Sequence, residues 1–277
     1  MANCCIFALQ TNDDNMRFSA IIVLAAMVQA GFAQDYAELV EAGKKHLEDK
    51  RYSEAADLFR RASNATENKS EKIYTLTNLG YAQRMSGKKE SAAESYAKAL
   101  AMDTSSIALL TQRGNILLEL DSAKEAIVCY DKILAREPAN REILQLRATA
   151  HTIAGNYKEG KIDYLKLISA NGNNKDARLG LALLYEKEGN INEALMMLEV
   201  LIEENPSNPE YYIARSNIER AQKQPELALQ DVEKAIELVA DNANYHILRA
   251  ELLKELGRDD AARRSRRKAI KLMSTPR

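Results

Sequence analysis

The chain has 277 residues, 46% of them hydrophobic, so it is long enough to bury the core of one large domain or two small ones. Only five Pro, eleven Gly and no Trp occur, while Ala, Leu, Glu, Lys and Arg abound, a composition that favours helices. The 39 basic and 40 acidic residues give a net charge of −1. This balance excludes the strong positive field of a non-specific nucleic-acid binder, so no nucleic acid is expected as a partner.

The first predicted element is the apolar segment MRFSAIIVLAAMVQAGFAQ, residues 16–34. It is continuously apolar from Ala20 to Val28. This is short for a bilayer span, which takes roughly 20 apolar residues. It has the length of a signal-peptide core, typically about 7–15 residues.

The flanks of this segment support export. Counted from Met16 the preceding residues are basic, whereas counted from Met1 they carry two Asp, the wrong sign for a signal. Small residues follow the core in VQA and GFA, so we predict a true start at Met16, cleavage after Ala33, and a leader and signal at 1–33. A buried first helix and an uncleaved membrane anchor are the alternatives.

The rest of the chain repeats itself. One small residue is followed twelve positions later by another, and four positions after that by a large one, at a spacing of 34 after a longer first interval. The first small column is Gly43, Gly80, Gly114, Ala148, Ala182, Ser216 and Ala250; the second is Ala55, Ala92, Ala126, Gly160, Ala194, Ala228 and Ala262. The large column is Phe59, Tyr96, Tyr130, Tyr164, Leu198 and Val232.

These columns have a packing explanation. Two antiparallel helices approach closely only where their side chains are small, and large residues fill the space beside that crossing. Glycines at 87, 155, 189 and 257 fall at the turn between the helices, where a left-handed cap is needed, and Pro225 marks a turn in one unit. Pro138 and Pro206 punctuate the passage to the next unit.

With this period the chain resembles the tetratricopeptide repeat (TPR) family, whose unit is a helix–turn–helix of 34 residues. Seven units fit, at about 36–69, 73–106, 107–140, 141–174, 175–208, 209–242 and 243–276. The resemblance implies an all-α, right-handed α-solenoid over residues 34–277. In the last unit Arg266 occupies the large column, as suits a terminal helix with no successor to cover it.

Catalytic chemistry is not indicated. His46, His151 and His246 lie in different repeats at framework aromatic positions, and Cys129 is the only thiol beyond the leader. No HExxH, CxxC, GxSxG or phosphate-binding glycine loop occurs, so we expect no enzyme activity, no catalytic residue, no cofactor and no metal.

The C-terminal stretch RDDAARRSRRKAIKLMSTPR is basic, with eight Lys or Arg against two Asp. It offers a contact for an anionic membrane surface, a polyanion or an acidic partner. The alternative is a solubilising cap on the exposed end of a solenoid.

The resemblance also suggests where a partner binds, because first helices line the concave surface of TPR proteins. Side chains of those helices that point away from the second helix form a mixed apolar, aromatic and amide lining suited to a peptide or partner helix. The candidates are Tyr74, Thr77, Tyr81, Arg84, Thr111, Asn115, Gln145, Thr149, Leu179, Leu183, Ile213, Asn217 and Arg220. Some of them could instead support neighbouring repeats.

One TPR subclass clamps the C-terminal carboxylate of chaperones with basic and Asn residues. Asn78 matches one position, but Val40, Lys44, Ala108 and Gln112 do not match the others, so this function is rejected.

The sequence therefore predicts a non-enzymatic protein-binding scaffold or adaptor, exported to the periplasm of a Gram-negative bacterium. The alternative is a membrane-anchored accessory or regulatory subunit of an envelope complex. Protein or peptide partners are expected, and the residues do not identify them.

Overall fold

The computed structural model describes residues 35–274, and every regular element in this range is a helix, with no strand. The predicted all-α class is confirmed. The predicted signal segment and its cleavage point lie outside the described residues, so they remain predictions.

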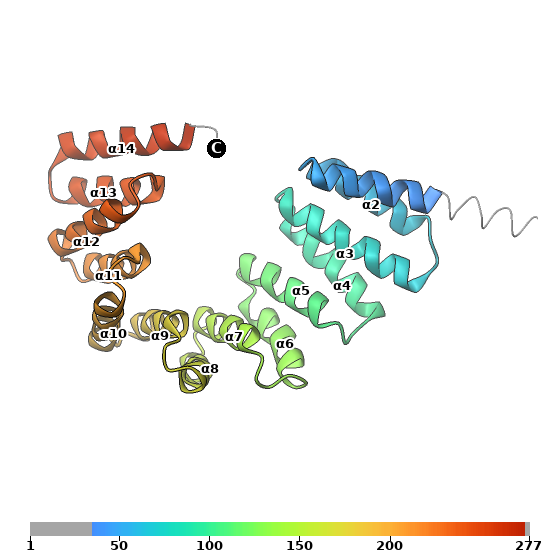
Figure 1. Ribbon diagram of the computed structural model, residues 1–277, viewed down its shortest axis with the longest axis horizontal. Coiled ribbons are helices and arrows are strands. Elements are labelled where there is room, and N and C mark those ends of the chain that lie inside the picture. The colour runs from blue at the N-terminus through green and yellow to red at the C-terminus, as the bar shows by residue number, and fades with distance from the viewer. Residues whose placement is uncertain (1–34, 275–277) are drawn as a thin grey trace, which may run out of the picture. The chain divides into compact units, whose positions relative to one another are not determined.

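The helices follow one another as hairpins of a first and a second helix (Figure 1). Residues 35–48 pair with α2 (Tyr52–Asn64), α3 (Lys69–Met85) with α4 (Lys89–Met102), and α5 (Ile107–Glu119) with α6 (Ala123–Leu134). They are followed by α7 (Arg141–Ile153) with α8 (Tyr157–Ala170), and α9 (Lys175–Glu188) with α10 (Ile191–Glu204). The last pairs are α11 (Pro209–Ala221) with α12 (Pro225–Leu238), and α13 (Ala243–Glu255) with α14 (Asp259–Ser274).

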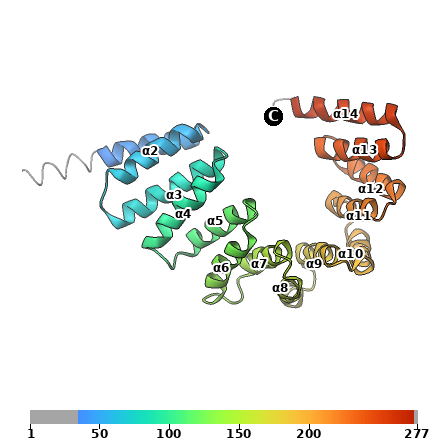
Figure 2. The same ribbon diagram turned by 180° about the vertical axis from the view of Figure 1, so that it is seen from behind.

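The chain forms two compact units, the first ending at Ile133 and the second beginning at Leu134. In the first unit α3 packs against both α2 and α4, and α4 packs against α5. In the second unit each helix from α7 to α14 packs against the next in chain order, as both views show for α11 to α14 (Figures 1 and 2). Both units are therefore stacks of hairpins built from local contacts.

The small and large columns meet inside the hairpins. Phe59, Tyr96 and Tyr130 are at most 1% exposed. A Cβ added to Gly114 would lie 2.6 Å from the ring of Tyr130, and one added to Gly80 would lie 2.9 Å from the ring of Tyr96. Heavy atoms this close clash, so these two crossings require glycine.

Side-chain caps begin the first helices of the hairpins. The side-chain oxygen Oδ1 of Asn68 accepts hydrogen bonds from the backbone N–H groups of Ser70 and Glu71 at 2.9 and 3.2 Å. These bonds satisfy two donors that would otherwise be unpaired at the start of α3. Equivalent caps begin α5, α7, α9, α11 and α13: Ser106, Asn140, Asn174, Asn208 and Asn242. The second helices α2, α4, α8, α10 and α12 have no capping side chain.

The turn inside each hairpin uses one left-handed residue. Glycine supplies it in four turns, with φ between 70° and 91°. Lys50, Asp121 and Lys223 adopt φ of 57°, 55° and 59° in the same column. In the turn before α12, the left-handed residue is thus Lys223, and Pro225 is the first residue of the helix, where its missing N–H has no cost.

Candidate partner-binding surface

The clearest exposed feature on a first helix is an aromatic stripe on α3. Tyr74, Tyr81 and Met85 are 41%, 42% and 44% exposed. Their spacing of seven and four residues places them on one face of the helix. We call these three residues the α3 stripe. Tyr36 adjoins it: burial raises the pKa of the Tyr36 hydroxyl, and the neighbouring Glu71 and Tyr74 add to the increase.

Two other candidates on α3 are engaged within the fold. The Thr77 hydroxyl donates to the carbonyl oxygen of Ile73 at 2.7 Å. The Arg84 guanidinium donates from Nε to Glu119 Oε1 at 2.9 Å, so it joins α3 to the first helix of the next hairpin. Partial burial alone would raise the pKa of Glu119, but hydrogen bonds from Arg84 and Lys89 hold it below its ordinary value.

The candidates on α5 are half-buried. Asn115 Oδ1 accepts a hydrogen bond of 2.9 Å from the buried Tyr130 hydroxyl, within the same hairpin. Thr111 lies one turn earlier and is also half-buried. Asn115 thus serves to satisfy a core tyrosine.

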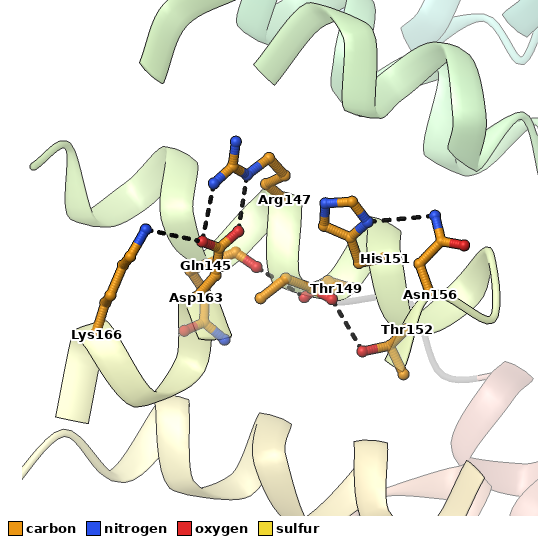
Figure 3. Close-up of polar contacts among 9 residues, drawn as sticks. Gln145, Arg147, Thr149, His151, Thr152, Asn156, Asp163 and Lys166 are labelled. Atoms are coloured by element: carbon orange, nitrogen blue, oxygen red, sulfur yellow. Dashed lines mark hydrogen bonds and ion pairs between the residues drawn. The ribbon is translucent and has the colours of Figure 1, made fainter. Parts of the chain in front are cut away.

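On α7 both candidates belong to a polar cluster inside the hairpin (Figure 3). Thr149 Oγ1 donates to the carbonyl oxygen of Gln145 at 3.0 Å and lies 3.2 Å from the Tyr164 hydroxyl. The same hairpin contains a bidentate ion pair, in which Arg147 donates from Nε and a terminal nitrogen to the two oxygens of Asp163 at 2.7 and 2.8 Å. Thr149 is therefore another structural residue.

On α9 and α11 the candidates divide. Leu183 is 37% exposed, and Asn217 is exposed as well. Leu179 and Ile213 are half-buried and pack against the cores of their own hairpins and the next ones. Arg220 donates to Glu251 at 2.8 Å and to Glu255 at 2.9 Å, joining α11 to α13.

The structure thus places eight of the thirteen predicted residues in two clear groups. Tyr74 and Tyr81 in the first unit, and Leu183 and Asn217 in the second, present exposed side chains. Arg84, Asn115, Thr149 and Arg220 hold hairpins together.

Comparisons with known proteins agree with this architecture. Two tetratricopeptide repeat family models match the chain, at residues 152–218 and 107–140. A crystal structure of a tetratricopeptide repeat protein from Parabacteroides merdae ATCC 43184 is similar over 86% of this chain and 93% of that one, with 27% identity and a TM-score of 0.75. The chain is a tetratricopeptide repeat protein.

A thermophilic TPR protein from Thermus thermophilus shares the fold at 18% identity and a TM-score of 0.51, over 60% of this chain and 91% of that one. Among curated proteins none matches the sequence. TPR domains generally bind protein partners, and TPR proteins generally act as scaffolds without catalysis.

The sequence interpretation missed the buried ion pairs of this TPR protein. Besides Arg147–Asp163, Arg215 donates to both oxygens of Asp231 at 2.7 Å across the α11–α12 hairpin. In both cases Arg stands immediately before the first small column and Asp follows sixteen residues later. This repeated Arg–Asp spacing is the feature of the sequence from which the ion pairs could have been predicted. The hydrogen bonds that Arg215 donates to Asp231 raise the pKa of Arg215, which keeps the guanidinium charged.

Glu219 lies beside the second of these pairs. Burial raises the pKa of its carboxyl to about 7, the negative charge of Asp231 adds to the increase, and Arg215 opposes it. Within residues 35–274, the buried Oε2 atom of Glu219 has no hydrogen-bond partner. Among the described residues, Glu219 is therefore a half-buried carboxyl whose neutral form the fold favours.

The histidines lie in packing positions. His151 and His246 are buried, with His151 Nδ1 3.4 Å from Asn156 Nδ2 and His246 Nε2 2.9 Å from the carbonyl oxygen of Ala240. Residues 35–274 contain no group of three His, Cys, Asp or Glu side chains placed to hold a metal ion. In the same range, no helix combines the length and apolarity needed to cross a membrane.

Proposed function

We propose that this TPR protein is a non-enzymatic scaffold or adaptor of the bacterial cell envelope. It holds a peptide or a partner protein in the concave groove that its first helices line. The α3 stripe is the observation that carries the proposal, because three large apolar side chains stay exposed on one helix face. Aromatic residues of this kind are the usual anchors of protein interfaces.

The neighbouring polar candidates support a binding surface made of apolar side chains, because their own polar groups already bond within the fold. Arg84 and Asn115 bond to other parts of the fold, so they offer little to a ligand. The surface therefore favours a partner that supplies apolar side chains to the tyrosines, rather than a carboxylate that would need free basic groups.

Binding through the α3 stripe can be tested with Tyr74→Ala and Tyr81→Ala together. Partners recovered from an envelope extract are identified, purified and titrated against both proteins. The double variant should weaken binding at least about tenfold, since interface tyrosines are frequent hot spots. The matched control is Ile162→Ala with Leu165→Ala, which removes two equally exposed apolar residues from the second helix α8. Equal weakening by both pairs, or by neither, would count against the α3 stripe.

The location rests on the sequence of residues 16–34. A basic start at Met16, an apolar core and small residues before Gln34 support export to the periplasm of a Gram-negative bacterium. The alternative function, an accessory subunit anchored by an uncleaved segment, differs in the mature N-terminus. Mass spectrometry of the protein from its native host decides: a start at Gln34 supports the periplasmic scaffold, and retention of 16–33 supports the anchored subunit.

A further inference from the structure

The last helix of the described chain, α14, concentrates positive charge. It carries six Lys or Arg and two Asp, a net charge of +4 in a chain whose total is −1. Both Asp lie in the first turn, where their negative charges interact favourably with the positive end of the helix dipole. Asp260 also forms an ion pair with Arg263. The other exposed arginines of this helix are Arg264, Arg266 and Arg267. Within residues 35–274, none of these three forms an ion pair.

The packing of α14 fixes which side is open. Ala262, Ser265 and Ala269 are buried, and the helix packs against α13 (Figure 1). The side of the helix next to this buried face carries exposed residues spaced by three and four positions, which lie along one stripe. We call this the α14 stripe; it consists of Arg263, Arg266, Arg267, Ile270 and Met273.

The apolar members of the α14 stripe are unusually exposed. Ile270 is 60% and Met273 is 59% exposed. Arg266 stands in the column that holds buried Tyr164, Leu198 and Val232 in earlier hairpins, yet it is exposed. A cap that served only solubility would have polar residues at 270 and 273. The stripe instead has three long cationic side chains followed along the helix by two apolar ones.

We propose that the α14 stripe docks on the surface of an anionic phospholipid bilayer. The arginines reach the lipid phosphates while Ile270 and Met273 enter the boundary between headgroups and acyl chains. Basic residues beside an anionic membrane each strengthen binding, and a planar surface meets one helix face at a time. A nucleic acid or a soluble polyphosphate would use the charges but give the two apolar side chains no role.

Vesicle sedimentation tests the proposal with the full chain. The probes are vesicles of phosphatidylcholine alone and of phosphatidylcholine with phosphatidylglycerol in equal parts. Every variant keeps the same N-terminal apolar segment, so differences between variants report on α14. Arg263→Gln with Arg266→Gln and Arg267→Gln should weaken binding to the anionic vesicles by about a hundredfold. Ile270→Ser with Met273→Ser should weaken it by about tenfold.

The control removes the same charge from exposed sites elsewhere, Arg60→Gln with Arg61→Gln and Arg141→Gln, and should bind as the parent does. Circular dichroism melting should be alike in all the proteins because the substituted side chains are exposed. Equal weakening by the control triple means general charge attraction and overturns the proposal. Tripolyphosphate could also displace the protein fully from the vesicles while the serine variant binds as the parent does. That result would mean that α14 is a phosphate-binding site, and it would overturn the membrane proposal as well. The scaffold proposal stands or falls independently, on the α3 stripe.

Discussion

At the level of single residues, the repeat imposes one backbone conformation on seven different turns. Four turns use glycine, which adopts positive φ without steric cost, whereas Lys50, Asp121 and Lys223 place a Cβ in the same region. These three residues are therefore less suited to their positions than the four glycines are.

The first prediction follows from this turn column. Lys223→Gly should raise the free energy of unfolding by about 0.5–1 kcal/mol, because it relieves the left-handed strain. The reverse exchange, Gly189→Lys, should lower it by about 1 kcal/mol. Thermal unfolding followed by circular dichroism measures both, and a loss of stability in Lys223→Gly would contradict the assignment.

The second prediction concerns the pH dependence of Glu219. Its pKa is about 7 in the folded protein and near 4.5 in the absence of burial. The folded state thus favours the protonated carboxyl, so this contribution to stability is complete at acidic pH and is lost as the pH rises through 7. Glu219→Gln should make the melting temperature less dependent on pH between about pH 4.5 and pH 7. The exposed Glu226→Gln is the control, and identical slopes in the two variants would refute the prediction.

At the level of elements, first and second helices start differently. A side-chain cap begins each first helix from α3 to α13, because these helices follow the open passage between hairpins. The second helices start directly from the hairpin turn, where the chain direction is already fixed.

The third prediction uses this difference. Asn208→Ala removes the cap of α11 and should cost about 1 kcal/mol of stability. Asn190→Ala, at the uncapped start of α10, should change stability by less than about 0.5 kcal/mol. Chemical denaturation of the two proteins makes the comparison, and equal losses would argue against a special role for the caps.

The fourth prediction concerns the ion pair inside the α7–α8 hairpin. Asp163 is almost fully buried, so Asp163→Ala leaves the Arg147 charge without its main partner and should cost about 3 kcal/mol. The next hairpin has Leu181 and Met197 in the same two columns.

The double variant Arg147→Leu with Asp163→Met should therefore recover most of that loss, since an apolar pair of similar volume replaces a buried ion pair. Urea denaturation of the single and double variants decides. If the double variant is less stable than Asp163→Ala, the charges contribute more than packing can replace.

At the level of the whole molecule, the fold class was predictable because its signal is repeated. Fourteen small residues and their large partners recur, at a spacing of 34 after the first interval, and each unit supports the same interpretation. The chain direction of every hairpin follows from those columns. The helix caps recur in most hairpins and the Arg–Asp spacing in two of them, and both could have been found by extending the same alignment.

The candidate surface was less predictable, because exposure depends on the neighbouring hairpin. Arg84 and Arg220 look like groove residues, yet each binds a Glu 35 residues later on the next first helix. Asn115 and Thr149 are drawn inward by tyrosine hydroxyls from their own second helices. Conversely, Met85 joins the exposed face of α3 although its column gave no such signal.

The central claim is that the first helices of this TPR protein contact the partner. Photo-crosslinking in the native host tests it most directly, with p-benzoylphenylalanine placed in turn at Tyr74, Tyr81, Ile162 and Leu165. The positions of Tyr74 and Tyr81 on α3 should crosslink to the same partner protein, and the two positions on α8 should not. Crosslinks from Ile162 and Leu165 with none from Tyr74 and Tyr81 would contradict it.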